Sequence, residues 1–219
     1  MASITNLTYK LLSVKHLCAV RNLIEEHFTS TFSLGVYLNW TKEDSIPAYY
    51  PRIESFLKQG NSLGAFSDKD AKLRGVAINV EHDDNERIKY DETLHISEKT
   101  DTINRLMVAI GVNQLSEILG TKKFWEMRMG TVHPSYRRKG LMPELIKRST
   151  VLAKQRGIER LVGCQTYNKA LVEPSKMKGF EVIRHIELKN YHDPVTGQKV
   201  FSGMKPPNDV QVLFAKTLT

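Results

Sequence analysis

The sequence predicts an α/β (α+β) fold that is centred on a strand, a loop, a helix and a second strand in succession. Nine residues with strand character, Phe124 to Val132, lead through a basic glycine-containing loop into an amphipathic helix at Pro143. A short strand of the buried type follows from Arg160 to Gln165. If the helix between the strands is a right-handed crossover, as nearly all such connections are, the two strands are parallel. We therefore expect a βαβ unit at the centre of the fold.

Length and composition favour a single domain. The chain has 219 residues, of which 41% are hydrophobic, and no compositional break divides it, so one core can include residues 1–219. Its two cysteines, Cys18 and Cys164, lie far apart and match no metal-ligand spacing. The sequence shows no charged-then-apolar leader and no apolar run of the ~20 residues that a bilayer requires. We expect a cytoplasmic monomer or weak dimer without a metal, a disulfide framework or membrane contact.

The chain carries a formal charge of +8, from 32 Lys and Arg against 24 Asp and Glu. Such an excess suits a nucleic acid, an anionic membrane or a phosphate-rich cofactor. The basic residues are scattered except at 137–139 and 147–160, and no nucleic-acid-binding signature accompanies them. We therefore expect no nucleic acid as a partner, and a small phosphate-bearing molecule as the cofactor.

The first part of the chain predicts one strand and two helices with polar N-caps. The connection between the helices, residues 29–41, is rich in aromatic and hydroxyl residues and is too long for a simple link. It is therefore either a functional loop or an ordinary surface excursion. The predicted elements are a strand from Leu7 to Leu12, a helix from Ser13 to about Phe28, and a helix from Asp44 or Ser45 to near Gly60.

The remaining elements follow from hydrophobic periods and turn residues. Two polar stretches, 82–100 and 189–209, are predicted to be exposed or turn-forming inserts. The elements are a hairpin of Ser62 to Phe66 and Leu73 to Val80, a helix from Asp101 to Leu119, a helix from Asn168 to Lys178, a strand from Phe180 to Leu188 and a last strand from Val210 to Ala215.

The loop after the central strand has the residues of an anion site. Arg137, Arg138, Lys139 and Gly140 lie directly before the predicted helix. A helix start offers unpaired backbone N–H groups and a partial positive charge, and the basic side chains add full charges beside them. The alternative is a surface turn with a solvated charge run. A phosphate group would be stabilised at this loop.

Three motifs follow one another around the central strand. They are Val132-His133-Pro134, the loop Arg137 to Met142, and Lys178-Gly179-Phe180. Together they resemble the VHP motif, the Arg/Gln-x-x-Gly-x-Gly/Ala pyrophosphate loop and the GF motif of the GNAT superfamily of N-acetyltransferases. The resemblance implies a twisted mixed sheet of about seven strands flanked by helices. It also implies that a splayed parallel strand pair holds acetyl-coenzyme A (acetyl-CoA) as co-substrate.

The resemblance further implies which residues hold acetyl-CoA. The loop would bind the pyrophosphate, although Met142 replaces the usual small residue and Pro143 removes one N–H donor. Exposed strand backbone would bind the pantetheine arm, and Gly130 could accommodate a bulge or serve only packing. The implied residues are Met129, Gly130, Thr131 and Val132 of the strand, Arg137, Arg138, Lys139, Gly140, Leu141 and Met142 of the loop, and Asn168 after the next strand.

Strand alternation suggests a catalytic base. A period of two places Glu126, Arg128, Gly130 and Val132 on one face of the central strand. A carboxylate there could accept the proton of an amine through water, whereas Arg128 beside it would favour the charged form. Glu126 is therefore a general base, a structural ion-pair partner or a residue that recognises the amine.

The chain is most similar in length and layout to the insect-type arylalkylamine, polyamine and agmatine N-acetyltransferases. The Glu-Pro-Leu loop that carries the base in that branch is absent after Phe28. Glu25 and Glu26 lie one turn earlier, where they could substitute for that base or be solvated charges. For the hydrogen bond to the departing thiolate, the resemblance implies Ser175, and Tyr167 is a second candidate. Each of these two, like Asn168, could instead be a helix cap.

Aromatic residues are concentrated where the resembled family builds its acceptor pocket. They could line a pocket for an aryl or alkyl amine or belong to the core. We expect direct acetyl transfer to a small primary amine in a ternary complex. One alternative is a module that binds coenzyme A without activity, and another is acetylation of a peptide or protein, whose groove the inserts at 82–100 and 189–209 would obstruct. The aromatic residues are Phe32, Tyr37, Trp40, Tyr49, Tyr50 and Phe56.

Overall fold

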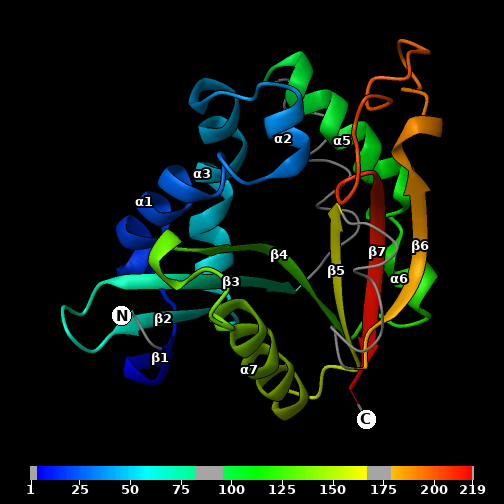
Figure 1. The fold of residues 1–219 in the computed structure, drawn as a ribbon. Coiled ribbons are helices and arrows are strands. Elements are labelled where there is room, and N and C mark those ends of the chain that lie inside the picture. Colours follow the sequence, from blue (N-terminus) through cyan, green and yellow to red (C-terminus); the bar gives the residue numbers. More distant parts are fainter. Residues whose placement is uncertain (1–3, 82–95, 167–178, 219) are drawn as a thin grey trace.

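The computed structural model describes residues 4–81, 96–166 and 179–218 of the chain (Figure 1). In this part of the chain, seven strands form one sheet in the order β1-β2-β3-β4-β5-β7-β6. Neighbouring strands are antiparallel except for β4 and β5, which are parallel. The predicted mixed sheet is confirmed. Its strands are β1 (Leu7–Leu11), β2 (Leu63–Ser67), β3 (Leu73–Glu81), β4 (Phe124–Val132), β5 (Arg160–Thr166), β6 (Glu181–Glu187) and β7 (Val210–Thr217).

Helices cover both faces of the sheet (Figure 1). On one face, Leu141 and Leu145 of α7 (Leu141–Gln155) pack against residues of β2, β3 and β4. The opposite face is covered by α1 (Leu17–His27), α3 (Lys42–Lys58), α5 (Glu98–Ile110) and the short α6 (Leu115–Leu119). Shorter segments are α2 (Ser33–Tyr37) and the 3-10 turns η1 (Ile4–Asn6), η2 (Val14–His16), η3 (Pro134–Tyr136) and η5 (Leu188–Asn190).

Ser13 caps the first helical segment, as predicted, but this segment starts with the 3-10 turn η2, and α1 begins only at Leu17. The backbone N–H of Ser13 donates to Nδ1 of His16 at 3.0 Å, which closes a capping box over the turn that leads into α1. Val20, Leu23 and Ile24 are buried and pack in one cluster with residues of β3 and β4. This stripe fixes α1 on the sheet at the level of the central strand.

Two predicted helix boundaries are wrong because caps act elsewhere. α3 begins at Lys42 because the backbone N–H of Thr41 donates to Asp44 at 2.9 Å in a capping box. The helix predicted from Asp101 to Leu119 is two helices. Ser97 caps the start of α5, and Gly111, with a φ of 96°, ends it before α6 begins.

The parallel strands β4 and β5 separate along their length. They pair only from Phe124 to Met127 on β4 and from Arg160 to Gly163 on β5. Beyond these residues the strands diverge, and Figure 1 shows the gap between the two arrows widening toward their ends. The splayed pair predicted from the resemblance is confirmed, and it leaves backbone of both strands without a strand partner on that side.

No helix in the described ranges is long and apolar enough to cross a membrane. Among the same residues, no group of three or more His, Cys, Asp and Glu side chains is placed to hold a metal ion.

Candidate active site

A cavity of about 450 Å³ lies where β4 and β5 separate. We call it the splay cavity. Met129 and Gly130 of β4 line one side, and Gly163 and Cys164 of β5 line the other. Because β4 beyond Met127 and β5 beyond Gly163 no longer pair with each other, their backbone groups on this side can bind an extended ligand. Of the implied cofactor residues, Met129, Gly130 and Met142 line this cavity.

A β-bulge on β4 overturns the predicted alternation of side chains. Ile78 of β3 faces Met129, but the next residue of β3 faces Met127, so Arg128 is the extra residue. The bulge reverses the pattern beyond it. Gly130 therefore lies on the α7 face, whereas Glu126 lines a cavity on the opposite face. The prediction that both share one face is wrong, and the bulge is at Arg128 rather than Gly130.

Met142 lies against Gly130 at the edge of the splay cavity. A Cβ atom added to Gly130 would lie 2.8 Å from Cε of Met142. Glycine at position 130 therefore leaves room for the Met142 side chain. The methionine occupies the space that a side chain at position 130 would need. Thr131 and Val132 are buried next to this contact.

The loop after β4 presents a row of free backbone donors. The N–H groups of Arg138 to Met142 make no backbone hydrogen bond within the described residues, and α7 begins at Leu141. Arg138 and Gly140 both have positive φ, 58° and 84°, and left-handed residues of this kind occur in the backbone nests that bind anions. Five donors at the start of a 15-residue helix form a cradle for an anion.

The basic side chains of the loop differ in how they are held. Nε of Arg137 donates to the carbonyl of Val132 at 3.0 Å, and Nζ of Lys139 donates to the carbonyl of Ser135 at 2.6 Å. Arg138 is exposed, and the structure gives it no hydrogen bond or ion pair among the described residues. Arg137 and Lys139 are thus each hydrogen-bonded to a backbone carbonyl, whereas Arg138 extends into solvent.

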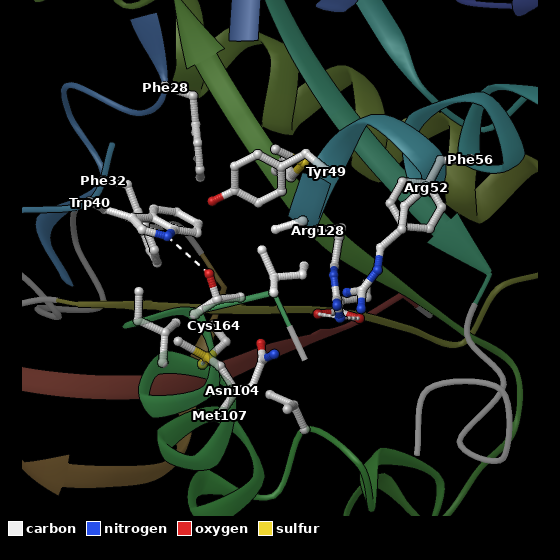
Figure 2. Close-up of a pocket in the computed structure, with 17 residues that line it drawn as sticks. Phe28, Phe32, Trp40, Tyr49, Arg52, Phe56, Asn104, Met107, Arg128 and Cys164 are labelled. Carbon is white, nitrogen blue, oxygen red and sulfur yellow. Dashed lines mark hydrogen bonds and ion pairs between the residues drawn. The ribbon is translucent and has the colours of Figure 1, made fainter. Parts of the chain in front are cut away.

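A second cavity, the aromatic cavity, lies between α1, α3, α5 and β4 (Figure 2). Four rings pack in a closed circuit on one wall. Their neighbouring centroids are 5.2 Å apart for Phe28 and Phe32, 5.7 Å for Phe32 and Trp40, 5.3 Å for Trp40 and Tyr49, and 5.2 Å for Tyr49 and Phe28. The indole N–H of Trp40 donates to Thr100 on α5 at 3.0 Å. This wall is a rigid surface for an apolar or aromatic group.

The other end of the aromatic cavity is charged. Glu126 is 5% exposed, and Nη1 of Arg128 lies 3.3 Å and 3.2 Å from its two carboxylate oxygens. Arg52 from α3 lines the same end, and Figure 2 shows the side chains of Arg52 and Arg128 pointing toward one another. Burial raises the pKa of the Tyr49 phenol well above its ordinary value, so this ring remains neutral.

The two cavities meet. Five residues line both of them, and the sequence had singled out only some of these as site residues. The sequence named Phe28 only as the approximate end of the first helix, and Cys164 only as a cysteine without a metal-ligand spacing. Neither carries a motif, because each reaches the site through the way α1 and β5 pack. The shared residues are Phe28, Phe32, Arg128, Met129 and Cys164.

Other candidates lie away from both cavities or outside the described residues. Glu25 binds Lys42 at 2.8 Å and the hydroxyl of Tyr50, and burial together with the bond to Glu25 raises the pKa of Tyr50 to about 12. The side chain of Glu26 is 65% exposed and lies 3.5 Å from His27. Tyr37 bonds to the backbone of Gly203. Three further candidates, Tyr167, Asn168 and Ser175, lie outside the described residues.

The sheet topology, the splayed pair of β4 and β5 and a family match together identify an N-acetyltransferase. The chain belongs to the acetyltransferase (GNAT) family, whose model matches residues 53–173, more than half of its length. No curated protein sequence is significantly similar to the chain.

Several solved structures with the same fold come from insects. A mosquito arylalkylamine N-acetyltransferase-like protein 5b is 20% identical with a TM-score of 0.80, over 97% of this chain and 100% of that one. Arylalkylamine N-acetyltransferase 2 from Aedes aegypti is 22% identical with a TM-score of 0.79, over 98% and 100%. A Drosophila melanogaster polyamine N-acetyltransferase that forms N-acetylagmatine is 12% identical with a TM-score of 0.75, over 97% and 100%. At these identities the likeness concerns the fold.

Proposed function

We propose that the protein transfers the acetyl group of acetyl-CoA directly to a small primary amine within a ternary complex. The observation that carries the proposal is the junction of the two cavities at Arg128 and Cys164. A thioester arm that follows the splay cavity would end at this junction. An amine seated in the aromatic cavity would reach the same point, so neither substrate has to leave its site for the transfer.

The loop Arg137 to Met142 is our proposed pyrophosphate site, and the backbone from Met129 to Val132 our proposed contact for the pantetheine arm. Five free N–H groups and three cations support the first assignment. Asn168 as a coenzyme contact and Ser175 or Tyr167 as hydrogen-bond donors to the thiolate are proposals from the sequence alone.

The acceptor is an arylalkylamine or a polyamine- or agmatine-like amine. The four-ring wall supports an aryl group, and the names of the insect neighbours cover both classes. A peptide acceptor is less well supported because residues of the insert at 189–209, among them Tyr191, Phe201 and Met204, pack in one cluster with Trp40.

Release of free thiol from acetyl-CoA tests the proposal. It would be measured with dopamine, tryptamine, agmatine, spermine and a lysine peptide, and acetyl-CoA binding would be titrated in parallel. Release with one of the small amines is the expected result. Tight acetyl-CoA binding without release for any amine would instead indicate a coenzyme-binding module.

A further inference from the structure

We propose that the guanidinium of Arg128 stabilises the negative charge that develops during acetyl transfer, and that Glu126 positions it. This inference rests on the proposed transferase function. It assigns to Arg128 the role of a catalytic residue and to Glu126 that of a positioning residue, in place of the general base that the sequence suggested.

Arg128 stands where the reacting groups must meet. Three charged residues line the aromatic cavity in the described part of the chain, Arg52, Glu126 and Arg128, and of these Arg128 alone also lines the splay cavity. The bulge explains this position. Arg128 is the unpaired extra residue of β4 and directly follows Met127, the last residue that pairs with β5, so it lies at the point where the two strands separate.

The pair is built so that Glu126 holds Arg128 in place. Both carboxylate oxygens face one nitrogen, Nη1, and the side chains are 6% and 18% exposed. Within the described residues, no hydrogen bond is found from Nε or Nη2 of Arg128. One edge of the guanidinium is therefore fixed on the buried carboxylate, and the more exposed side chain of the pair is the cation.

A cation at this point would assist acetyl transfer. The amine nitrogen uses its lone pair to form the C–N bond, negative charge collects on the carbonyl oxygen, and the C–S bond then breaks with its electrons going to sulfur. The amine loses one proton to water, and the thiolate takes one up. A fixed cation in a site shielded from water stabilises both the oxyanion and the thiolate. It also favours the neutral amine over the ammonium ion, because like charges disfavour each other.

The pH dependence of turnover separates the two roles of Glu126. If Glu126 positions Arg128, Glu126→Gln leaves an acceptor for Nη1 but makes the cation less compensated, so the ammonium of bound substrate loses its proton more easily. The acidic limb of kcat then moves to lower pH, and the plateau stays within about tenfold of the wild type. If Glu126 is the base, kcat at neutral pH falls by about 10²–10⁴-fold.

The experiment measures kcat, KM and pH profiles by thiol release for the wild type, Arg128→Met, Arg128→Lys, Glu126→Gln and Arg52→Met. Arg128→Met should lower kcat by about 10²–10³-fold with little change in KM for acetyl-CoA, and lysine should restore part of the loss. Arg52→Met is the matched control in the same cavity and should act mainly on the KM of the amine. The double variant Arg128→Met with Glu126→Gln avoids a stranded buried carboxylate if the single variant fails to fold.

A kcat for Arg128→Met, or for the double variant, within about threefold of the wild type would overturn the inference while leaving the proposed function intact. So would a 10²-fold or larger loss in Glu126→Gln, which is the result for a base. Absence of thiol release from the wild type with every amine would remove the proposed function, and the inference with it.

Discussion

The splay cavity and the aromatic cavity are built in different ways. The splay cavity lies between β4 and β5, two strands of one βαβ unit whose pairing ends at Met127 and Gly163, so it offers strand backbone without a strand partner, and the adjoining loop presents backbone N–H groups. The aromatic cavity is formed by side chains from α1, the segment around α2, α3, α5 and β4. Backbone groups are the same for every residue type, so the first site tolerates substitutions that would change the second. If the proposed function holds, we expect the choice of acceptor amine to depend on the aromatic cavity.

Removing one ring should have the largest effect, because the aromatic cavity depends on side chains that support each other. Trp40 is 8% exposed, contacts Phe32 and Tyr49, and bonds to Thr100. Trp40→Ala should lower the free energy of unfolding by about 3–5 kcal/mol, which is typical of a buried aromatic residue. It should also raise the KM of the amine while acetyl-CoA affinity changes little.

Thermal unfolding and calorimetric titration with acetyl-CoA check this prediction. Trp40→Phe is the control, since it keeps a ring and loses the bond to Thr100. Equal losses of amine and acetyl-CoA affinity in Trp40→Ala would show that the two cavities are not independent.

The contrast between the splay cavity and the aromatic cavity also explains which parts of the site could be predicted from the sequence. The cofactor side follows from local sequence, and β4 was predicted to the residue because its pattern and its flanking turn are contiguous in the chain. The bulge at Arg128 was not predictable, because it arises from the register between β3 and β4. Phe28 and Cys164 were missed as site residues for a similar reason, since tertiary packing alone brings α1 and β5 together at the junction.

The second largest effect is expected on the cofactor side. Arg137→Ala combined with Arg138→Ala removes two cations from the loop and leaves the backbone donors in place. Each lost charge-assisted contact should weaken acetyl-CoA binding by about 1.5–3 kcal/mol if it is shielded from water. The loss should be larger at low salt than at high salt.

Calorimetric dissociation constants at two salt concentrations test this pair of substitutions. The control is Lys58→Ala with Lys189→Ala, which also removes two charges but from side chains 63% and 69% exposed on other elements. An unchanged dissociation constant in the arginine variant would contradict the assignment of the phosphate loop.

A smaller effect is expected at Met142, whose side chain narrows the splay cavity. Met142→Ala should tighten acetyl-CoA binding by about tenfold at most, because the ligand no longer forces the methionine off its preferred rotamer, a cost of about 0.5–1.5 kcal/mol. Calorimetric titration of Met142→Ala with acetyl-CoA measures this change in affinity. Weaker binding would mean that the thioether packs on the ligand, and that Met142 compensates for the small residue usual in the family.

The smallest effect concerns the pH dependence of stability, and we expect it to arise at His133, which directly follows β4. Burial lowers the pKa of His133 below its ordinary value of 6.5, and the positive charges of Arg74, His27 and Arg137 lower it further, while Glu26 opposes them. Between the folded and unfolded pKa values the unfolded chain binds more protons, so stability rises with pH. The contribution is complete above pH 6.5 and is lost as the pH falls through the lowered pKa.

His133→Asn removes this titration and keeps the cap, because Nδ1 of His133 accepts from the backbone N–H of Ser135 at 3.2 Å and an asparagine oxygen can do the same. The fall in Tm between about pH 7.5 and about pH 5.5 should therefore be smaller in this variant than in the wild type. His192→Asn, at an exposed histidine, is the control. Equal pH slopes in His133→Asn and the wild type would contradict the prediction. The aromatic cavity should contribute no such slope through Tyr49, since burial raises the pKa of that phenol well above 10 and leaves it neutral throughout this range.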